Sequence, residues 1–258
     1  MIVVTGPGRS GTSFVALLYR ELGFDPGGPW RPRDSAGLED SSFVEVNEAL
    51  MQALGTSVAM GRRARRGRWG RRGARVDTRL ADGLRTRPGL FGHLAALVDW
   101  SRYRGLPLDV VDWPKVAEIA AEHGERLRSL SSMTSVVKDP RFCWTLPVWF
   151  AAGATVEAVV LVLRDLDAVV DSRSRTFGHV VGEQGRSWAK NDFVYGIGLA
   201  LSTAVAQRVP VEIVRFPDLF EDPRDLHDRL PLPEARDWER FLRAFEAVRD
   251  SSLVHDER

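Results

Sequence analysis

Short apolar runs alternate along the chain with segments that carry helical periodicity. Three of the runs are Ile2–Thr5, Val156–Leu163 and Val211–Phe216, and a fourth lies in Thr134–Arg141, where it ends in charge and in Pro140. A nearly continuous apolar run is typical of a parallel strand that is buried on both faces. The pattern therefore predicts the strands of a parallel sheet.

Segments with apolar positions at helical spacing lie between and after these runs. The first ends at Gly23, the next begins after Glu39 and Asp40, and residues 90–104 and 114–130 carry the same periodicity. Strands separated by helices predict an α/β fold with a doubly wound parallel sheet flanked by helices. The two later segments predict a helical insertion between the first and second core strands.

Length and net charge limit the classes of protein that the chain can belong to. The 258 residues suit one domain over residues 1–258, with the insertion at about 56–132. The 36 basic and 35 acidic residues give a net charge of +1, so overall charge indicates neither a nucleic-acid nor a membrane partner.

Cysteine, histidine and hydropathy indicate the compartment. Cys143 is the only cysteine and the five histidines have no paired ligand spacing, so we expect no disulfide framework and no metal site. No run of about 18 apolar residues is present that would span a membrane. The chain opens directly on a core strand, which leaves no room for a signal peptide. We therefore expect a soluble, cytoplasmic protein.

A dense run of arginines lies within the predicted insertion. Eight arginines fall between Arg62 and Arg75, interleaved with glycines and with Trp69. Charge at this density does not pack in a core, so the segment is predicted to be solvated. A lid or docking arm for an acidic substrate is an alternative. Trp69 alone makes no aromatic platform for bases, which argues against RNA or DNA binding.

A glycine-rich loop follows the first strand and precedes a helix. Such a loop holds a phosphate or sulfate through backbone N–H groups and the positive end of the helix. Gly6, Gly11 and Ser13 keep the frame of a Walker nucleotide loop, but Thr12 occupies the lysine position, and the cation is instead Arg9. An arginine in the loop suits a less charged group that transfers without a bridging metal, and sulfuryl is such a group. The predicted fold is therefore of the P-loop type.

Arg9, Lys138 and Arg164 each lie at or just after the end of a predicted strand. Ligands bind beyond the carboxyl ends of the strands in an open parallel sheet, so we expect these side chains at one edge. Ser172 follows Arg164 about two turns into the next helix, where the two can reach one phosphate. The alternative is an arginine that caps a strand and an ordinary helix serine.

The loop resembles that of sulfotransferases that use 3′-phosphoadenosine 5′-phosphosulfate (PAPS), in which Lys/Arg-Ser-Gly-Thr-Thr/Ser wraps the 5′-phosphosulfate. Arg164 and Ser172 match the arginine, seven residues and serine of the 3′-phosphate site of that family. The segment Lys138-Asp139-Pro140 is similar to the Lys-Asp-Pro element of bacterial and tyrosylprotein sulfotransferases, whose lysine touches the transferring group.

Two further segments extend the resemblance. Glu39 and Asp40, followed by Asn47, resemble a bacterial segment whose glutamate acts as the base. The late strand and turn are similar to the Tyr-Glu-Asp-Leu element of the family, but Phe216 and Pro217 replace its Tyr and Glu. Residues 60–130 match nothing in the family, and we expect them to shape the acceptor pocket.

The resemblance implies a sulfotransferase that moves the sulfuryl group of PAPS to a hydroxyl or amine of a small-molecule, sugar or peptide acceptor, and releases adenosine 3′,5′-bisphosphate without a metal. It implies that Glu39 is the base, that Lys138 stabilises the leaving oxygen and that Arg9 acts on the transferring group. The residues implied to hold the donor are Gly8, Arg9, Ser10, Gly11, Thr12, Ser13, Arg164 and Ser172.

Three alternatives stay open at this point. A P-loop kinase of a small molecule would share the fold, but it needs a lysine and a magnesium site, and Thr12 argues against both. A nucleotide-binding protein without catalysis is the second alternative. For Glu39 and Asp40, the third is negative charge that complements the dipole of the helix that follows.

Overall fold

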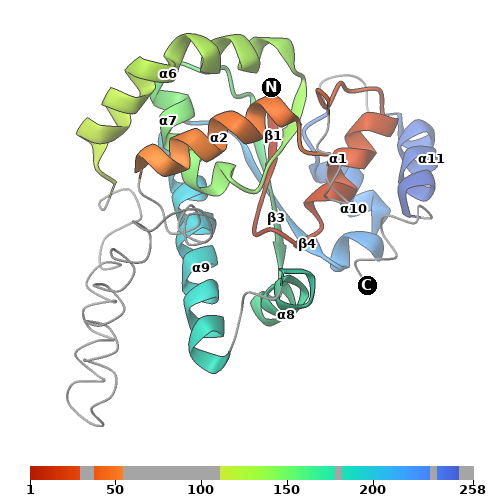
Figure 1. The fold of residues 1–258 in the computed structure, drawn as a ribbon. Helices are drawn as coiled ribbons and strands as arrows, with labels where there is room; N and C mark the ends of the chain where they lie inside the picture. Colours follow the sequence, from red (N-terminus) through yellow and green to blue (C-terminus); the bar gives the residue numbers. More distant parts are fainter. Residues whose placement is uncertain (30–37, 55–110, 178–181, 233–236, 250–258) are drawn as a thin grey trace.

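A computed structural model of the chain describes residues 1–29, 38–54, 111–177, 182–232 and 237–249. Within these residues, four strands form one sheet (Figure 1). The strands are β1 (Ile2–Thr5), β2 (Val136–Lys138), β3 (Ala158–Arg164) and β4 (Val211–Phe216).

The sheet is parallel throughout and has the order β2-β1-β3-β4. Ile2 lies opposite Val136 of β2 on one side and opposite Ala158 of β3 on the other. The chain thus passes from β1 to a neighbour on one side and then crosses to the opposite side. This reversal places a switch point between the carboxyl ends of β1 and β3, where ligands bind in open parallel sheets.

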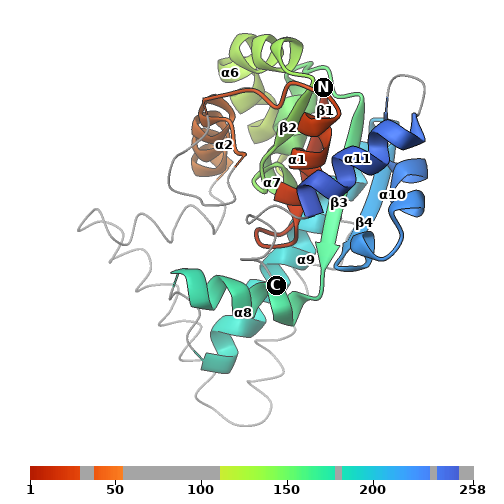
Figure 2. The same cartoon turned by 90° about the vertical axis from the view of Figure 1, so that its right-hand side faces the viewer.

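Helices cover both faces of the sheet (Figures 1 and 2). The described helices are α1 (Thr12–Glu21), α2 (Ser41–Leu54), α6 (Trp113–Met133), α7 (Phe142–Ala151), α8 (Leu166–Phe177), α9 (Gly182–Ala206), the 3₁₀ turn η2 (Asp218–Phe220), α10 (Pro223–Arg229) and α11 (Trp238–Arg249). Alternate residues of β1 divide the core: Ile2 and Val4 pack with α1 and α11, whereas Val3 packs with α2, α6 and α7.

One helix lies across the carboxyl edge of the sheet instead of along a face. α8 follows β3 directly and lies beyond its tip in both views (Figures 1 and 2). Val169 and Val170 of α8 form a small apolar cluster with Phe193 of α9. α8 therefore brings side chains to the edge at which the strands end.

The predicted α/β fold is confirmed as a parallel sheet flanked by helices. The strand predicted within Thr134–Arg141 is only Val136–Lys138, because β1, its one neighbour among the described strands, pairs there through three residues. The helix predicted at 114–130 is α6. Residues 55–110, which include the arginine run and the helix predicted at 90–104, lie outside the described residues, so the insertion stays a prediction.

No helix in the described part of the chain combines the length and the apolarity that crossing a membrane requires. The longest, α9, keeps polar and charged residues such as Lys190 and Asp192 within its first half. Its apolar residues are spread around the helix, which explains why helical periodicity did not single it out in the sequence.

Candidate functional site

The glycine-rich loop between β1 and α1 is fixed by the ends of two other strands. A Cβ atom on Gly6 would lie 2.1 Å from the carbonyl oxygen of Val162 in β3, and one on Gly11 would lie 2.4 Å from the ring of Phe216 in β4. Gly11 has a φ of 90°, which favours glycine, and Arg9 adopts a φ of 77° in the same loop. The tight contacts therefore require glycine at positions 6 and 11.

The inside of the loop has the features of an anion cradle. Ser10 is fully buried, and among the described residues its Oγ has no hydrogen-bond partner. A buried hydroxyl without a partner is costly unless a ligand or water satisfies it. Thr12 and Ser13 open the first turn of α1, and Gly11 before them supplies no side-chain cap. A Cβ on Gly8 would meet nothing within 4 Å, so the loop has open space at this position.

Arg9, Arg164 and Ser172, here called the arginine–serine cluster, meet beside this loop. Arg164 Nη1 donates to the backbone oxygen of Arg9 at 3.3 Å, across 155 residues of sequence. Arg9 Nε donates to Ser172 Oγ of α8 at 3.1 Å. The guanidinium of Arg164 also lies 4.7 Å from the ring centroid of Phe216. Three separate segments therefore bring these groups to the switch point between β1 and β3.

Glu39 lies in a second group of polar residues, at the end of β2. Lys138 Nζ donates to Glu39 Oε1 at 2.9 Å, and Arg141 Nη1 donates to Glu39 Oε2 at 3.1 Å. Glu39 and Lys138 are both buried. Each carboxylate oxygen of Glu39 therefore has its own cationic donor.

Asp139 and Asn47 are linked to Glu39 by hydrogen bonds through Arg141. Asp139 is fully buried and accepts hydrogen bonds from Asn47 Nδ2 at 2.8 Å and from Arg141 Nη1 at 2.9 Å. Asn47 Oδ1 in turn accepts from Thr145 Oγ1 at 2.7 Å and from Trp149 Nε1 at 2.8 Å. We call Glu39, Lys138, Asp139, Arg141 and Asn47 the Glu39 network.

The charges of this network shift the pKa values of its carboxyl groups. Burial raises the pKa of Glu39, but the charges and hydrogen bonds of Lys138 and Arg141 outweigh burial and hold that pKa below its ordinary value. Burial also raises the pKa of Asp139, and there the cationic neighbour Arg141 does not compensate fully. Glu39 is therefore a carboxylate at neutral pH, and Lys138 and Arg141 stabilise its charge.

The two acidic residues before α2 have different contacts. Asp40 Oδ1 accepts hydrogen bonds from the backbone N–H groups of Ser42 at 2.7 Å and Phe43 at 3.2 Å, so Asp40 caps the helix. Glu39 contacts Lys138 and Arg141 instead. The interpretation that negative charge complements the dipole of the following helix therefore applies to Asp40 and not to Glu39.

Sequence reasoning gave Arg141 no role, although it contacts Glu39, Asp139 and Glu48. The sequence feature that could have indicated a role for Arg141 is its position directly after Lys138-Asp139-Pro140. Trp149 is fully buried in the core. Trp144 is half-buried and stacks on Tyr195, with 5.3 Å between the ring centroids. The side chain of Trp188 lies outside the described residues.

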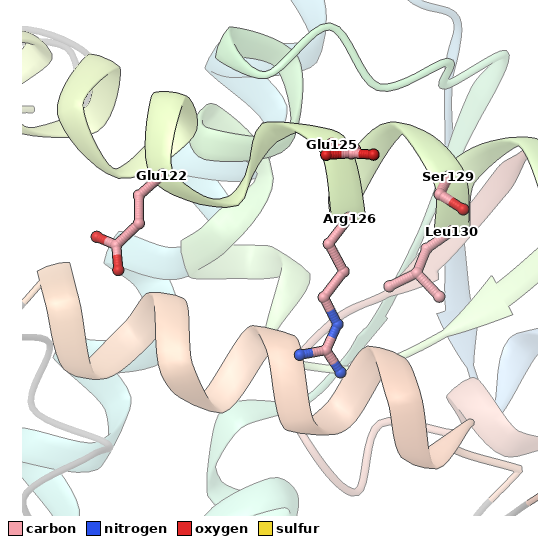
Figure 3. A pocket seen from close by; sticks show the side chains of 5 residues that line it. All are labelled: Glu122, Glu125, Arg126, Ser129 and Leu130. Carbon is pink, nitrogen blue, oxygen red and sulfur yellow. The ribbon is translucent and has the colours of Figure 1, made fainter.

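A surface hollow of about 440 Å³ lies elsewhere, along α6 (Figure 3). Arg126 points from α6 toward α2, where it pairs with Glu45 at 3.2 Å. The lining residues all come from one helix and none belongs to the predicted site, so we assign no function to the hollow. They are Glu122, Glu125, Arg126, Ser129 and Leu130.

Within the described residues, no group of three or more histidine, cysteine, aspartate or glutamate side chains is placed to hold a metal ion. Comparison with family models, with curated proteins and with solved structures finds no match to this chain.

Proposed function

We propose that this chain is a sulfotransferase of the P-loop type, which moves a sulfuryl group from PAPS to a hydroxyl or amine of an acceptor. The observation that carries the proposal is the arginine–serine cluster. Arg9, Arg164 and Ser172 come from three segments and lie in hydrogen-bond contact beside a glycine-rich loop. A donor with phosphate groups at both ends needs such a set of cations and hydroxyls at a strand switch point.

In this proposal, the loop binds one end of the donor, and Arg164 and Ser172 bind the other. The amides of the loop, Arg9 and the hydroxyls of Thr12 and Ser13 would bind the 5′-phosphosulfate, and the unpartnered Oγ of Ser10 fits the same role. Arg164 and Ser172 would bind the 3′-phosphate. The ring of Phe216, 4.7 Å from the guanidinium carbon of Arg164, would help to hold that side chain in place.

The Glu39 network would carry the transfer itself. The acceptor oxygen attacks the sulfur, the bond from sulfur to the bridging oxygen of the donor breaks, and the acceptor proton passes to Glu39. Lys138 would neutralise the leaving oxygen. Lys138 is bound to Glu39 at 2.9 Å, so it reaches the donor only when this pair loosens. Loss of that contact would raise the proton affinity of Glu39 at the moment when a base is needed.

Arg141 would keep the carboxylate in position during this exchange. Its contacts with Asp139 at 2.9 Å and with Glu48 at 3.2 Å hold its guanidinium while it donates to Glu39 Oε2. Oε1, the atom that Lys138 leaves, would then accept the proton.

Two measurements test the proposal against its alternatives. In calorimetry, adenosine 3′,5′-bisphosphate is expected to bind without metal and more tightly than ATP with Mg²⁺. Transfer of labelled sulfate from PAPS to a panel of hydroxyl and amine acceptors then tests catalysis. Tighter binding of ATP with Mg²⁺ would support a small-molecule kinase, and binding of the bisphosphate without transfer would support a nucleotide-binding protein without catalysis.

A further inference from the structure

Arg173 of α8 is a half-buried cation that belongs to neither the arginine–serine cluster nor the Glu39 network. Its guanidinium lies 5.2 Å from the ring centroid of Phe193 in α9. Within the residues that the structure describes, no hydrogen bond or ion pair engages its N–H groups. Its immediate neighbour, Ser172, belongs to the arginine–serine cluster. Arg173 therefore brings a charge to the edge of the site without a bonded counter-charge.

Among the described residues, burial and the neighbouring charges act on the pKa of Arg173 in both directions. Burial lowers the pKa of Arg173, Asp192 of α9 opposes that effect, and the positive charge of Arg141 adds to it. A cation removed from water is costly unless an anion pairs with it, and buried charges in proteins are normally paired. A bound anion would supply the missing partner.

The position of Arg173 on α8 indicates which substrate would supply that anion. Successive residues of a helix point about 100° apart, so Arg173 is turned away from the direction of Ser172 and Arg9. It is turned toward α9 and lies close enough to Arg141 to feel its charge. Arg141 binds Glu39 directly. Arg173 is thus turned from Ser172 toward α9, with the charge of Arg141 from the Glu39 network within electrostatic range, and this is the direction in which the proposed function would put an acceptor.

We propose that Arg173 is a binding residue for an anionic group, such as a carboxylate, on the acceptor. The ring of Phe193 covers one face of the guanidinium and leaves the N–H edge for a bidentate contact with a carboxylate. The acceptor would then be a hydroxyl or amine compound that already carries negative charge. The assignment of the anion to an acceptor rests on the proposed sulfotransferase function, whereas the anion site itself does not.

The test uses two small phenols that differ only in charge. 4-Hydroxybenzoate and its neutral amide, 4-hydroxybenzamide, are titrated calorimetrically into the full chain in the presence of adenosine 3′,5′-bisphosphate. The wild-type protein is expected to bind the carboxylate about tenfold more tightly or better, the gain expected of one hydrogen-bonded charge. Arg173→Gln is expected to abolish this preference. Arg175→Gln, which removes an exposed arginine of the same helix, is expected to retain it.

Folding of the variant is checked by thermal melting. Removing an unpaired cation is expected to leave the melting temperature of Arg173→Gln at or above that of the wild type. A wild-type protein that does not distinguish the two phenols, or a preference that survives in Arg173→Gln, overturns the proposal. If the charge preference depends on Arg173 but no sulfuryl group is transferred to any acceptor, the proposed function fails while the anion site stands.

Discussion

The arginine–serine cluster and the Glu39 network lie at the same edge of the sheet, and their cations make different contacts. In the cluster, Arg9 and Arg164 contact a hydroxyl, a backbone oxygen and an aromatic ring. In the network, Lys138 and Arg141 contact carboxylates at about 3 Å. The contacts named for Arg9 and Arg164 are with neutral groups, whereas Lys138 and Arg141 are largely neutralised by the carboxylates of Glu39 and Asp139.

Under the proposed function, this contrast puts donor binding and chemistry on different sides of β1. The cluster is suited to hold a charged donor, since its hydrogen bonds to neutral oxygens are readily exchanged for stronger bonds to phosphate. The network is suited to hold one carboxylate in a fixed orientation, because buried partners engage both of its oxygens. Variants on the two sides should therefore separate turnover from donor affinity.

The largest expected effect is on turnover, in Glu39→Gln. The variant keeps the shape of the side chain and removes its ability to accept a proton, so we expect the sulfuryl-transfer rate to fall by about 10²–10⁴-fold. Calorimetry with adenosine 3′,5′-bisphosphate should give unchanged affinity. Glu45→Gln is the matched control, because Glu45 is an exposed residue of α2 that pairs with Arg126. Near-normal turnover in Glu39→Gln would assign the base elsewhere.

A smaller effect is expected on donor affinity, in Arg164→Ala. Loss of a charged hydrogen-bond donor to a phosphate should weaken binding of the bisphosphate by about 10–100-fold. Arg215→Ala serves as the control, since Arg215 lies on β4 with its side chain 75% exposed. Equal affinities of the Arg164→Ala and Arg215→Ala variants would remove Arg164 from the donor site.

Next in size is an effect on stability, in Asn47→Ala. Asn47 is fully buried and bonds to Asp139, Thr145 and Trp149, so its loss removes the hydrogen-bond partner described above for Trp149 Nε1 and for Asp139 Oδ2, and one bond of Thr145. We expect the free energy of unfolding in urea to fall by about 2 kcal/mol. Asn191→Ala changes an exposed residue of α9 and should leave the free energy of unfolding unchanged. Similar unfolding free energies for both variants would contradict the supporting role of Asn47.

The smallest effect concerns pH. Because the pKa of Glu39 is lowered in the folded protein, its ion pairs stabilise the fold fully above the ordinary value of 4.5, and this contribution is lost as the pH falls through the lowered pKa. The difference in unfolding free energy between wild type and Glu39→Gln should therefore shrink on acidification. A difference that is constant from neutral to acidic pH would show that Lys138 and Arg141 do not stabilise the charge of Glu39.

Much of the fold was accessible from the sequence because it depends on local patterns. β-Branched runs predicted three of the strands to within two residues at each end, and the run at 211–216 is β4 itself. β2 is shorter than its segment suggested, and α9 was not predicted, because its apolar residues are spread around the helix. These departures come from strand pairing and helix packing, which local periodicity does not contain.

Part of the candidate site could be predicted from the sequence. The rule that ligands bind beyond strand ends predicts from the sequence that Arg9, Lys138 and Arg164 lie at one edge. It did not indicate that Arg9 would donate to Ser172, that both oxygens of Glu39 would be bound by cations, or that Arg173 would lack a bonded partner among the described residues.

The sequence by itself determined the strands, the glycine-rich loop and the charged residues that follow them, because each depends on neighbours a few positions away. Only the tertiary structure decided which of these charges meet. Lys138 and Glu39 are separated by 99 residues, and Arg9 and Ser172 by 163. Contacts over such separations depend on the order of the strands and on how the helices pack against them. Burial and charge balance, which govern the proton affinity of Glu39, follow from that packing.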